Sequence, residues 1–396
     1  MDMPSTCVVI VGAGPAGLAT ARGLADAGVP CLVLEKESRA AIENQPRAGY
    51  LEEWAARALS ERGIADPLGA GAGVQGNCEF RFEGACHVFD YEELTGDRHV
   101  VYPQQQLVRD LLHAYVDEAG GAIEFEVADV GFEGVTTGKP AVSYTDRSGA
   151  RRLVGCEVIV GADGARGVSR RAITDLGARV LRSDLGVRWL TVLAQAPPSC
   201  DRVAFGMHRS GFAMFAARGP RTTRYYLELP AGDEAEDWPD ERIWQELTRR
   251  LEAADRPPVS PGPITEKRVL DMHNYVVEPM SLGRLHLVGD SAHLLAPIAA
   301  KGMNLALSDA FILTDALADH LVRGSGGGLA EYTERALQRV WQYQEFTQWL
   351  SEIMHGPSSG DPFRARTAGV RLRRLTGSRR FARAVADLYL GIDAEF

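Results

Sequence analysis

Several features that would identify other classes of protein are missing from this sequence. No stretch approaches the roughly 20 consecutive apolar residues that a membrane-spanning helix requires, and residues 1–6 lack the basic segment of a signal peptide. The six cysteines form no CxxC pair and no spacing typical of metal ligands, which favours reduced, buried thiols. We therefore expect a cytoplasmic protein with no metal site and no membrane partner.

An excess of positive charge is missing as well. The formal net charge is −10 at pH 7, and such a chain has no electrostatic reason to bind nucleic acid. An anionic substrate would need a local basic site. With 45% hydrophobic and 24% charged residues the composition is that of a globular protein. A chain of 396 residues is too long for one ordinary core, so we expect two or three packed layers or domains.

The sequence opens with the pattern of a strand, a helix and a second strand. Cys7–Val11 is a short, β-branched apolar run that stops at a glycine-rich turn. Pro15–Ala27 then repeats apolar positions at helical spacing, and a second apolar run follows at Pro30–Leu34. This order predicts a βαβ unit.

The turn of this unit carries the signature of a dinucleotide site. Gly12, Gly14 and Gly17 fit the pattern GxGxxG, and Glu35 ends the second strand. The three glycines permit a tight turn, a close approach of pyrophosphate to backbone N–H groups, and close packing of helix on strand. The helix N-terminus favours phosphate and Glu35 can accept hydrogen bonds from ribose. We predict dinucleotide binding by these residues and Ala16; the pattern alone does not separate FAD from NAD.

The middle and end of the chain follow other patterns. Polar and apolar residues alternate from about Val180 to Leu270, around one amphipathic helix near Glu241–Leu251, which predicts an antiparallel sheet with one face toward a ligand. The chain beyond Gly302 is mostly helical in pattern. Shorter signals predict a helix at Gln104–Ala119, strands at Glu157–Gly161 and Leu285–Val288, and a loop at Gly324–Gly328.

Two further segments decide which dinucleotide is bound. One strand runs into Asp163-Gly164, and a later strand ends in Gly289-Asp290. Alone, each could be a surface turn with a solvated carboxylate. Together, after the βαβ unit, they resemble the fingerprints of the flavoprotein aromatic hydroxylases, the single-component FAD monooxygenases, and most closely the branch that acts on 4-hydroxybenzoate. Other segments similar to that branch are Pro46–Gly49, Val101–Gln104, Arg224–Tyr226, Val276–Met280, Ala300–Leu305 and Tyr389–Gly391.

The resemblance implies an α/β fold in three parts. Residues 1–178 would form a Rossmann-like FAD-binding βαβ domain, with an inserted segment at about 73–101 that joins the substrate side. Residues 179–272 would form the antiparallel β-sheet substrate domain. Residues 273–396 would hold the Gly-Asp flavin segment and a helical C-terminal interface region, in a homodimer.

The resemblance also assigns residues to the cofactor. Met303 with Asn304 would bind the flavin pyrimidine edge, where residues 302–304 open a helix whose free N–H groups would stabilise negative charge on reduced flavin. The remaining implied FAD contacts are Asp290 at the ribitol, Arg47 on the pyrophosphate side, Gln104 at the ribityl chain, and Asp163.

The implied chemistry begins with reduction of the flavin by NAD(P)H. Oxygen then adds at C4a, and the distal oxygen of this hydroperoxide is transferred to an electron-rich ring, so the cofactor carries the difficult chemistry. No second dinucleotide pattern is present in the sequence, so the nicotinamide would dock on the FAD domain, at positions Lys36, Glu37, Arg166 and His273. Glu37 would repel the 2′-phosphate of NADPH, which favours NADH.

The resemblance further implies the substrate site. Arg218 would anchor a substrate carboxylate, since a guanidinium binds carboxylates in a bidentate manner; the alternative is an arginine solvated at a strand edge. Ala216 lacks the hydroxyl that would share this carboxylate. The implied substrate residues are Phe205, Ala216, Arg218, Tyr226 and Pro297, and the implied catalytic residues are Pro297, Tyr389 and Arg224.

Two positions depart from the family in one proton relay. Phe205 replaces a tyrosine that helps to deprotonate the 4-hydroxyl group, and Val74 replaces the histidine that passes the proton to solvent. A phenyl ring cannot relay a proton. The sequence therefore predicts a substrate that is nucleophilic without ionisation, such as an amino- or amino-hydroxybenzoate or a carboxylated indole, with 4-hydroxybenzoate bound as the protonated phenol. The alternative is drift, with slower turnover of 4-hydroxybenzoate.

Two other readings compete with a hydroxylase. One is another flavin oxidoreductase, such as a halogenase, amine oxidase or prenyl-chain reductase; a halogenase is disfavoured because the sequence has no WxWxIP segment. The other is a catalytically weak flavoprotein that binds and protects a ligand. Substrate-stimulated oxidation of NAD(P)H separates an active hydroxylase from the latter.

Overall fold

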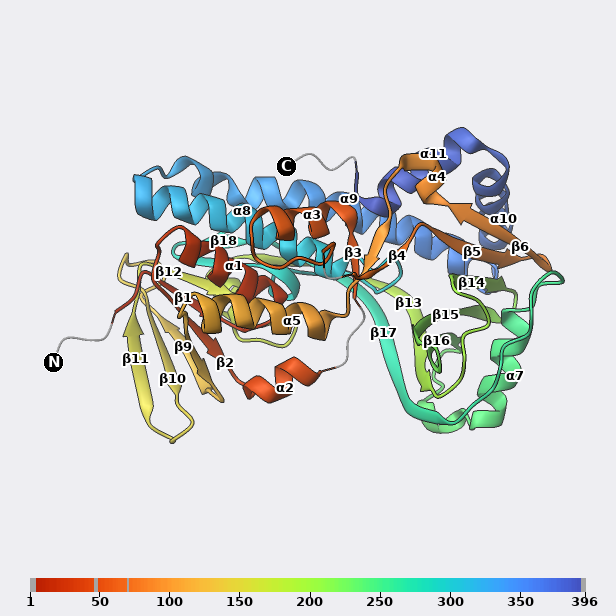
Figure 1. Cartoon of the computed structure of the whole chain (residues 1–396), viewed down its shortest axis with the longest axis horizontal. Helices are drawn as coiled ribbons and strands as arrows, with labels where there is room; N and C mark the ends of the chain where they lie inside the picture. Colours follow the sequence, from red (N-terminus) through yellow and green to blue (C-terminus); the bar gives the residue numbers. More distant parts are fainter. Residues whose placement is uncertain (1–4, 46–48, 70, 393–396) are drawn as a thin grey trace.

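The computed structural model describes residues 5–45, 49–69 and 71–392, and its first half is built on a parallel sheet (Figure 1). β1 pairs in parallel with β2 and with β12, and all four residues of β1 are buried. The predicted βαβ unit is thereby confirmed. The sheet has the order β18 (Ser281–Leu282), β19 (Leu285–Leu287), β12 (Val158–Gly161), β1 (Val8–Val11), β2 (Cys31–Glu35) and β8 (Ala122–Phe125). We call this sheet and the elements packed on it the parallel-sheet half.

Helices and a small second sheet complete this half. α1 (Pro15–Asp26) packs against α5 (Gln104–Leu112) and α8 (Gly302–Arg323). The predicted helix at 104–119 is α-helical only to Leu112 and continues as a π turn to Glu118. The core also takes in a sheet of β9 (Ala128–Glu133), β10 (Ala141–Thr145) and β11 (Arg151–Gly155), and the shorter helices are α2 (Arg39–Asn44), α3 (Glu53–Glu61) and α6 (Ser169–Asp175).

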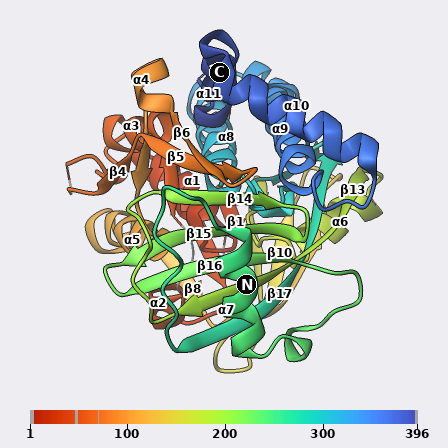
Figure 2. The ribbon, with the colours of Figure 1, turned by 90° about the vertical axis from the view of Figure 1, so that its right-hand side faces the viewer.

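The second half is an eight-stranded sheet, which we call the antiparallel-sheet half. Alternation along β16 sends every second residue into a core covered by α7 (Asp240–Arg250). The opposite face packs against the C-terminal helices. The strands of this sheet have the order β20 (His293–Leu294), β17 (Ile264–Glu278), β13 (Arg179–Ala194), β16 (Thr222–Leu229), β15 (Gly211–Gly219), β14 (Val203–His208), β5 (Asn77–Phe82) and β6 (Ala85–Asp90). Figure 2 shows this sheet with α7 in front.

Long strands join the two halves. β13 and β17 pair from Arg179↔Glu278 to Ala194↔Ile264, so the boundary predicted between residues 272 and 273 falls inside β17. From the segment 73–101, β5 and β6 enter the large sheet, whereas β4 (Gly73–Gln75) and β7 (His99–Val101) pair with β3 (Tyr50–Glu52) in a separate three-stranded sheet.

The C-terminal part is helical, as predicted. α8 ends at Gly324, a left-handed cap, and α9 already begins at Gly327, so the predicted loop at 324–328 is shorter than expected. α9 (Gly327–His355) runs from α8 to the large sheet, where α10 (Pro362–Gly377) and α11 (Arg379–Leu390) follow (Figure 1). α11 packs against α4 (Tyr91–Thr95) from the first half of the chain. Within the described ranges, no helix is both long and apolar enough to span a membrane.

Candidate active site

The glycine-rich turn after β1 is held by contacts that only glycine permits. Gly12 has a φ of 107°, and a Cβ on it would lie 2.3 Å from the carbonyl oxygen of Ala162. A Cβ on Gly17 would lie 2.0 Å from the carbonyl oxygen of Gly12. A Cβ on Gly14 would meet no atom within 4 Å. Gly12 and Gly17 therefore serve close packing of α1 on the sheet, whereas Gly14 leaves the approach to the helix N-terminus open.

Glu35 fixes this turn from the end of β2. Its Oε2 accepts from the N–H of Ala13 at 2.7 Å and its Oε1 accepts from the N–H of Glu37 at 2.9 Å. The side chain is buried. Each carboxylate oxygen has a second lone pair, so this arrangement leaves capacity for a ribose hydroxyl.

The Gly-Asp segment lies between the two helices that a flavin nucleotide would contact. Gly289 has a φ of 64°, and a Cβ on it would approach Ala16 on α1 and Ala306 on α8 at 3.4 and 3.2 Å. The N–H of Gly289 donates to Oδ2 of Asp309 at 2.8 Å. The structure thus brings Gly289, which precedes Asp290, next to Ala16 at the carboxyl edge of the parallel sheet, where ligands bind in folds of this type.

Asp163 has one satisfied and one unsatisfied oxygen. Oδ2 accepts from the N–H and the hydroxyl of Ser169, both at 2.9 Å. Oδ1 is buried and has no hydrogen-bond partner among the described residues. Burial raises the pKa of this carboxyl, against hydrogen bonds from Ser169 that lower it. A buried acceptor without a partner is costly, and a bound ligand with a donor would satisfy it.

The N-terminus of α8 is open toward the space between the halves. No side chain caps it, and a Cβ on Gly302 would meet no atom within 4 Å. The side chain of Asn304 is hydrogen-bonded within the protein: its Oδ1 accepts from the N–H of Glu52 at 2.9 Å and its Nδ2 donates to the carbonyl of Tyr50 at 3.1 Å. Asn304 thus ties β3 to α8, and the half-buried Met303 precedes it.

Beneath this helix start lies a buried ion pair that the sequence does not reveal. Lys301 donates to Glu52 and to the carbonyls of Leu388 and Tyr389, the last two at 3.0 and 2.8 Å. Burial would raise the pKa of the Glu52 carboxyl, but the charge of Lys301 and hydrogen bonds from Lys301 and Tyr343 outweigh it and lower the pKa. The two partners are 249 positions apart, so no local pattern signals the pair.

The predicted substrate residues lie mainly on one face of the large sheet. Phe205 is buried and stacks on Phe80 with ring centroids 5.5 Å apart. Ala216 is buried in the same apolar cluster, against which Tyr226 packs. This face is therefore aromatic and apolar, as a ring-binding surface requires.

Arg218 is the extra residue of a β-bulge. Ala217 pairs with Thr223 and Gly219 with Thr222, so Arg218 has no partner in the register between β15 and β16. Such a bulge redirects a side chain, and Arg218 is half-buried. Burial raises the pKa of Tyr50, and the positive charge of Arg218 offsets part of that rise.

The predicted catalytic residues have separate surroundings. Both terminal nitrogens of Arg224 donate to Glu266, each at 3.2 Å. Pro297 is exposed in the loop before α8. Tyr389 packs edge-on against His99 and Tyr91, with centroids 5.1 and 5.4 Å away; these two residues were not among the sequence-based candidates.

The predicted nicotinamide positions divide into two groups. Lys36 and Glu37 are exposed beside the end of β2. His273 stacks on Tyr275, and Tyr275 lies under the guanidinium of Arg170, 4.4 Å from its ring centroid. Arg170 in turn donates to the carbonyl of Ala165 at 2.7 Å, next to the exposed Arg166. Arg170 and Tyr275 thus connect two predicted positions, although the sequence did not single them out.

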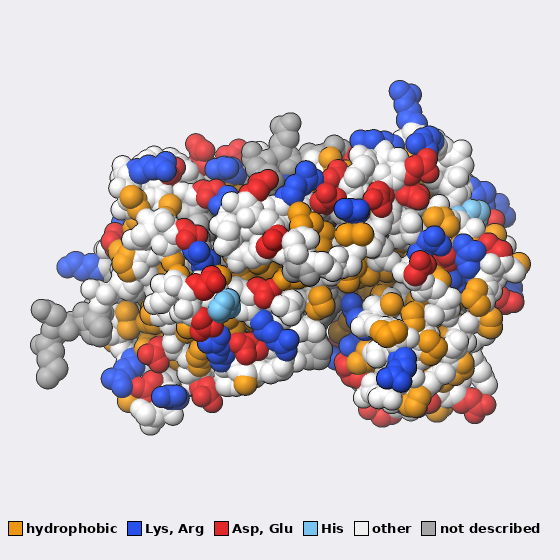
Figure 3. All heavy atoms as spheres, in the orientation of Figure 1, with side chains coloured by type: hydrophobic (Ala, Val, Ile, Leu, Met, Phe, Trp, Pro, Cys, Tyr) orange, Lys and Arg blue, Asp and Glu red, His pale blue; other side chains and the backbone are white. Residues whose placement is uncertain are grey.

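These features together fit FAD. Hydrogen-bond donors and an acceptor lie along the edge where the nucleotide and the flavin would bind. The donors are the backbone N–H groups at the open position of Gly14 and at the uncapped N-terminus of α8. The acceptor is the unsatisfied oxygen of Asp163. Figure 3 shows a hollow between the two halves on the viewed face. Gln104 opens α5, and Arg47 lies outside the described residues.

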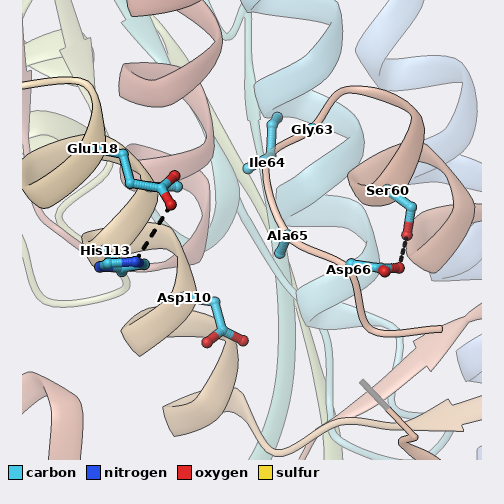
Figure 4. A pocket seen from close by; sticks show the side chains of 9 residues that line it. Ser60, Gly63, Ile64, Ala65, Asp66, Asp110, His113 and Glu118 are labelled. Carbon is cyan, nitrogen blue, oxygen red and sulfur yellow. Dashed lines mark hydrogen bonds and ion pairs between the residues drawn. The ribbon is translucent and has the colours of Figure 1, made fainter. Parts of the chain in front are cut away.

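A separate hollow of about 380 Å³ between α3 and α5 has none of these features (Figure 4). Its acidic groups are already engaged: Asp66 accepts from the hydroxyl of Ser60 at 2.9 Å, and Asp110 accepts from Gln106 at 2.9 Å. Within the described part of the chain, no cluster of histidine, cysteine or carboxylate side chains could hold a metal ion, and all six cysteines are free.

Comparison with known proteins identifies relatives across the whole chain. Residues 5–347 match the family model described as an FAD binding domain. The p-hydroxybenzoate hydroxylase of Acinetobacter baylyi is 31% identical over 396 residues, which cover 100% of this chain and 97% of that protein. The aklavinone 12-hydroxylase of Streptomyces peucetius is 29% identical over 83% of this chain and 70% of its own length.

Solved structures share the fold. The p-nitrophenol 4-monooxygenase of Pseudomonas putida superposes with a TM-score of 0.83 at 19% identity, covering 100% of both chains. An aklavinone-11 hydroxylase in complex with FAD and aklavinone superposes with a TM-score of 0.73 at 22% identity, covering 93% of this chain and 71% of that one.

Proposed function

Because the chain belongs to the FAD-dependent aromatic hydroxylases, we propose that it hydroxylates an electron-rich aromatic ring that carries a carboxylate, with NAD(P)H as reductant and O₂ as oxidant. The substrate would be an amino- or hydroxybenzoate-like acid or an indole-like acid.

The position of Arg218 carries this proposal. It is a half-buried cation on a bulge at the margin of the aromatic face that includes Phe205, Ala216 and Tyr226. A guanidinium at the edge of an apolar surface binds one end of a flat carboxylic acid and leaves the ring against the apolar part. The half burial of Arg218 disfavours the alternative of an arginine solvated at a strand edge.

The protein groups then have distinct tasks. When bound and reduced, the flavin supplies the activated oxygen for the ring. The N–H groups at the start of α8 would stabilise negative charge at the flavin, Arg218 would hold the acid in place, and the buried side chains around Phe205 would exclude water. The pair of Lys301 and Glu52 holds the start of α8 against β3 and α11.

A panel of aromatic acids tests the proposal. FAD-loaded protein should oxidise NAD(P)H faster when a substrate is present, with equivalent consumption of O₂ and formation of a hydroxylated acid. Absence of stimulation by every benzoate- and indole-type acid, in protein that retains FAD, would contradict it.

The assembly is proposed to be a homodimer formed through the C-terminal helices. Phe363 and Val370 are 77% and 58% exposed and lie two turns apart on α10, so they share one apolar stripe of that helix. Light scattering on the unmodified protein and on Phe363→Ser would test this, since the variant should shift toward monomer.

A further inference from the structure

A tryptophan that the sequence did not single out belongs to the aromatic face of the large sheet. Trp189 of β13 is 0% exposed. Its indole stacks on Phe212 of β15, with ring centroids 5.0 Å apart, and meets Tyr226 of β16 edge-on at 5.6 Å. Phe212 in turn stacks on Phe205 at 6.4 Å. Trp189 therefore touches one predicted substrate residue directly and lies one ring away from another.

The strand register places Trp189 at the far end of this face from the predicted carboxylate anchor. Ala216 and Phe212 on β15 lie on the same face of the sheet, because they are an even number of positions apart in a regular stretch of strand. Four positions at about 3.3 Å per residue separate them by roughly 13 Å. Arg218 lies two positions beyond Ala216, whereas Trp189 stacks on Phe212. A flat acid held by Arg218 would therefore extend along the strands toward the indole.

A histidine at the end of α9 fixes the position of the indole. Nε1–H of Trp189 donates to Nε2 of His355 at 2.9 Å, and Nδ1 of His355 lies 2.9 Å from the carbonyl of Ser351. Because a carbonyl only accepts, Nδ1 carries the proton and Nε2 is free to accept from the indole. His355 is 2% exposed, and burial lowers its pKa, in agreement with a neutral ring. Without this acceptor the buried indole N–H would be unsatisfied.

The end of α9 is attached to the sheet by other groups as well. The hydroxyl of Ser358 donates to the carboxylate of Glu228 on β16, whose oxygens lie 3.0 and 2.8 Å away. Oε2 of Glu228 also accepts from the N–H of Phe212 at 2.7 Å. None of these bonds uses the imidazole of His355. Loss of that imidazole therefore leaves the end of α9 attached to the sheet, and its main effect falls on Trp189.

We propose that Trp189 is a specificity-determining residue, which closes the aromatic face opposite Arg218 and limits the substrate to an acid with one aromatic ring, and that His355 is the residue that positions its indole. This inference rests on the proposed function and narrows it. A benzoate-like acid fits between Arg218 and Trp189, whereas a second ring fused beyond the first would meet the indole. Close packing in a cluster of this kind leaves the indole little freedom to move aside.

Two acids that differ by one ring test the inference. 4-Aminobenzoate and 6-amino-2-naphthoate each carry a carboxylate and an amino group at opposite ends, and the second has one more fused ring. Isothermal titration calorimetry on FAD-loaded protein gives the Kd of each acid. The unmodified protein should bind 4-aminobenzoate about tenfold or more tightly than the naphthoate, although the naphthoate has more apolar surface to bury.

Removal of the indole should change this preference. Trp189→Leu should bind 6-amino-2-naphthoate about tenfold or more tightly than the unmodified protein does, because the space beyond the first ring becomes free. His355→Leu removes the acceptor and should shift the preference in the same direction by a smaller factor. His355→Gln should restore most of the preference, because its side-chain carbonyl can accept from the indole.

Trp238→Phe is the matched control. Trp238 is also buried and its Nε1–H also donates to a side chain, to Asp233 at 3.0 Å, but it belongs to the core on the opposite face of the sheet. Its replacement should leave the ratio of the two Kd values unchanged. If Trp189→Leu does not retain FAD, Trp189→Phe, which keeps a ring beside Phe212 but is smaller, takes its place with the same expected direction.

A gain in affinity for the larger acid separates specificity from damage, since a variant that is only destabilised gains affinity for neither acid. The inference would be overturned by a naphthoate that binds the unmodified protein as tightly as 4-aminobenzoate, by failure of 4-aminobenzoate to bind, or by no gain in an FAD-loaded Trp189 variant. Equal behaviour of His355→Gln and His355→Leu would overturn the positioning role. In each of these cases, stimulation of NAD(P)H oxidation by any aromatic acid would leave the proposed function standing.

Discussion

The glycine turn at Gly12–Gly17 and the tyrosine cluster around His99 are built in opposite ways. In the turn, backbone atoms of β1, α1 and β12 approach so closely that single added carbons would overlap with them. In the cluster, side chains from positions 50, 91, 99 and 389 meet through ring contacts and one weak hydrogen bond. The structure of the cofactor region therefore depends on the shape of the backbone. The structure of the region around His99 depends on the identity of the side chains that meet there.

The largest effect is expected where backbone shape decides. In Gly17→Ala the new Cβ would overlap with the carbonyl of Gly12, so α1 must move away from the sheet, at about 1–3 kcal/mol of stability and roughly 100-fold in FAD affinity. Gly14→Ala meets no protein atom and should weaken FAD binding while leaving the melting temperature of the apoprotein unchanged. Calorimetry and FAD fluorescence titration measure both quantities. Equal effects of the two substitutions on stability would contradict the division of roles.

Loss of one side chain on the substrate face should have the next largest effect. Arg218→Ala should lower kcat/KM by roughly 100-fold, because a hydrogen-bonded charge contributes about 1.5–3 kcal/mol. In the unmodified enzyme, an amide analogue of the best acid should lose about as much, and the two losses should not add. Arg221→Ala, an exposed arginine three positions later, is the matched control. Additive losses would show that Arg218 does not contact the carboxylate.

The same contrast explains what the sequence could and could not predict. Gly12, Gly17 and Glu35 lie within 24 positions of one another, and their pattern is typical of a single local structure, the βαβ unit. This unit could therefore be predicted from the sequence. Glu52 and Lys301 are far apart in the chain and meet only after folding. The boundary predicted between residues 272 and 273 falls inside β17, because this strand runs without a break from Ile264 to Glu278.

The substrate residues show a further limit. Phe205 and Val74 were compared position by position with a family pattern, and that comparison predicts two lost side chains. It cannot show that Trp189 and His355, 166 positions apart in the chain, meet beside the same face, because this contact forms only in the folded protein. The position of Arg218 likewise depends on a bulge between β15 and β16, and no feature of the local sequence predicts this bulge.

Acid stability offers a test of the buried His99. Burial lowers the folded-state pKa of this histidine to about 4, below the ordinary value of about 6.5. Between these two values the unfolded chain binds a proton that the folded protein does not, so stability falls as the pH falls from 6.5 to 4, by at most about 1.4 kcal/mol per pH unit from this group. Urea unfolding at saturating FAD should show a shallower fall for His99→Asn. An identical pH dependence would mean that His99 is protonated or solvated in the folded protein.

The smallest effect is expected at the exposed pair of Lys36 and Glu37 on the cofactor side. A substitution there changes neither the backbone nor a buried contact. The carboxylate of Glu37 lies 3.9 Å from Nζ of Lys36, with the two side chains 55% and 75% exposed. If the ribose of the nicotinamide coenzyme docks here, Glu37 repels the 2′-phosphate of NADPH and the unmodified enzyme should prefer NADH. Since exposed charges interact by less than about 1 kcal/mol, Glu37→Gln should move the ratio of kcat/KM values toward NADPH only a few-fold. Lys36→Gln should move it in the opposite direction, and both shifts should shrink as salt is added, because ions screen exposed charges.

Flavin reduction followed by stopped-flow absorbance with each coenzyme gives the ratio directly. A shift of the same sign in both variants, or one that is unaffected by salt, would show that the coenzyme phosphate does not approach this pair and docks instead beside His273 and Arg166.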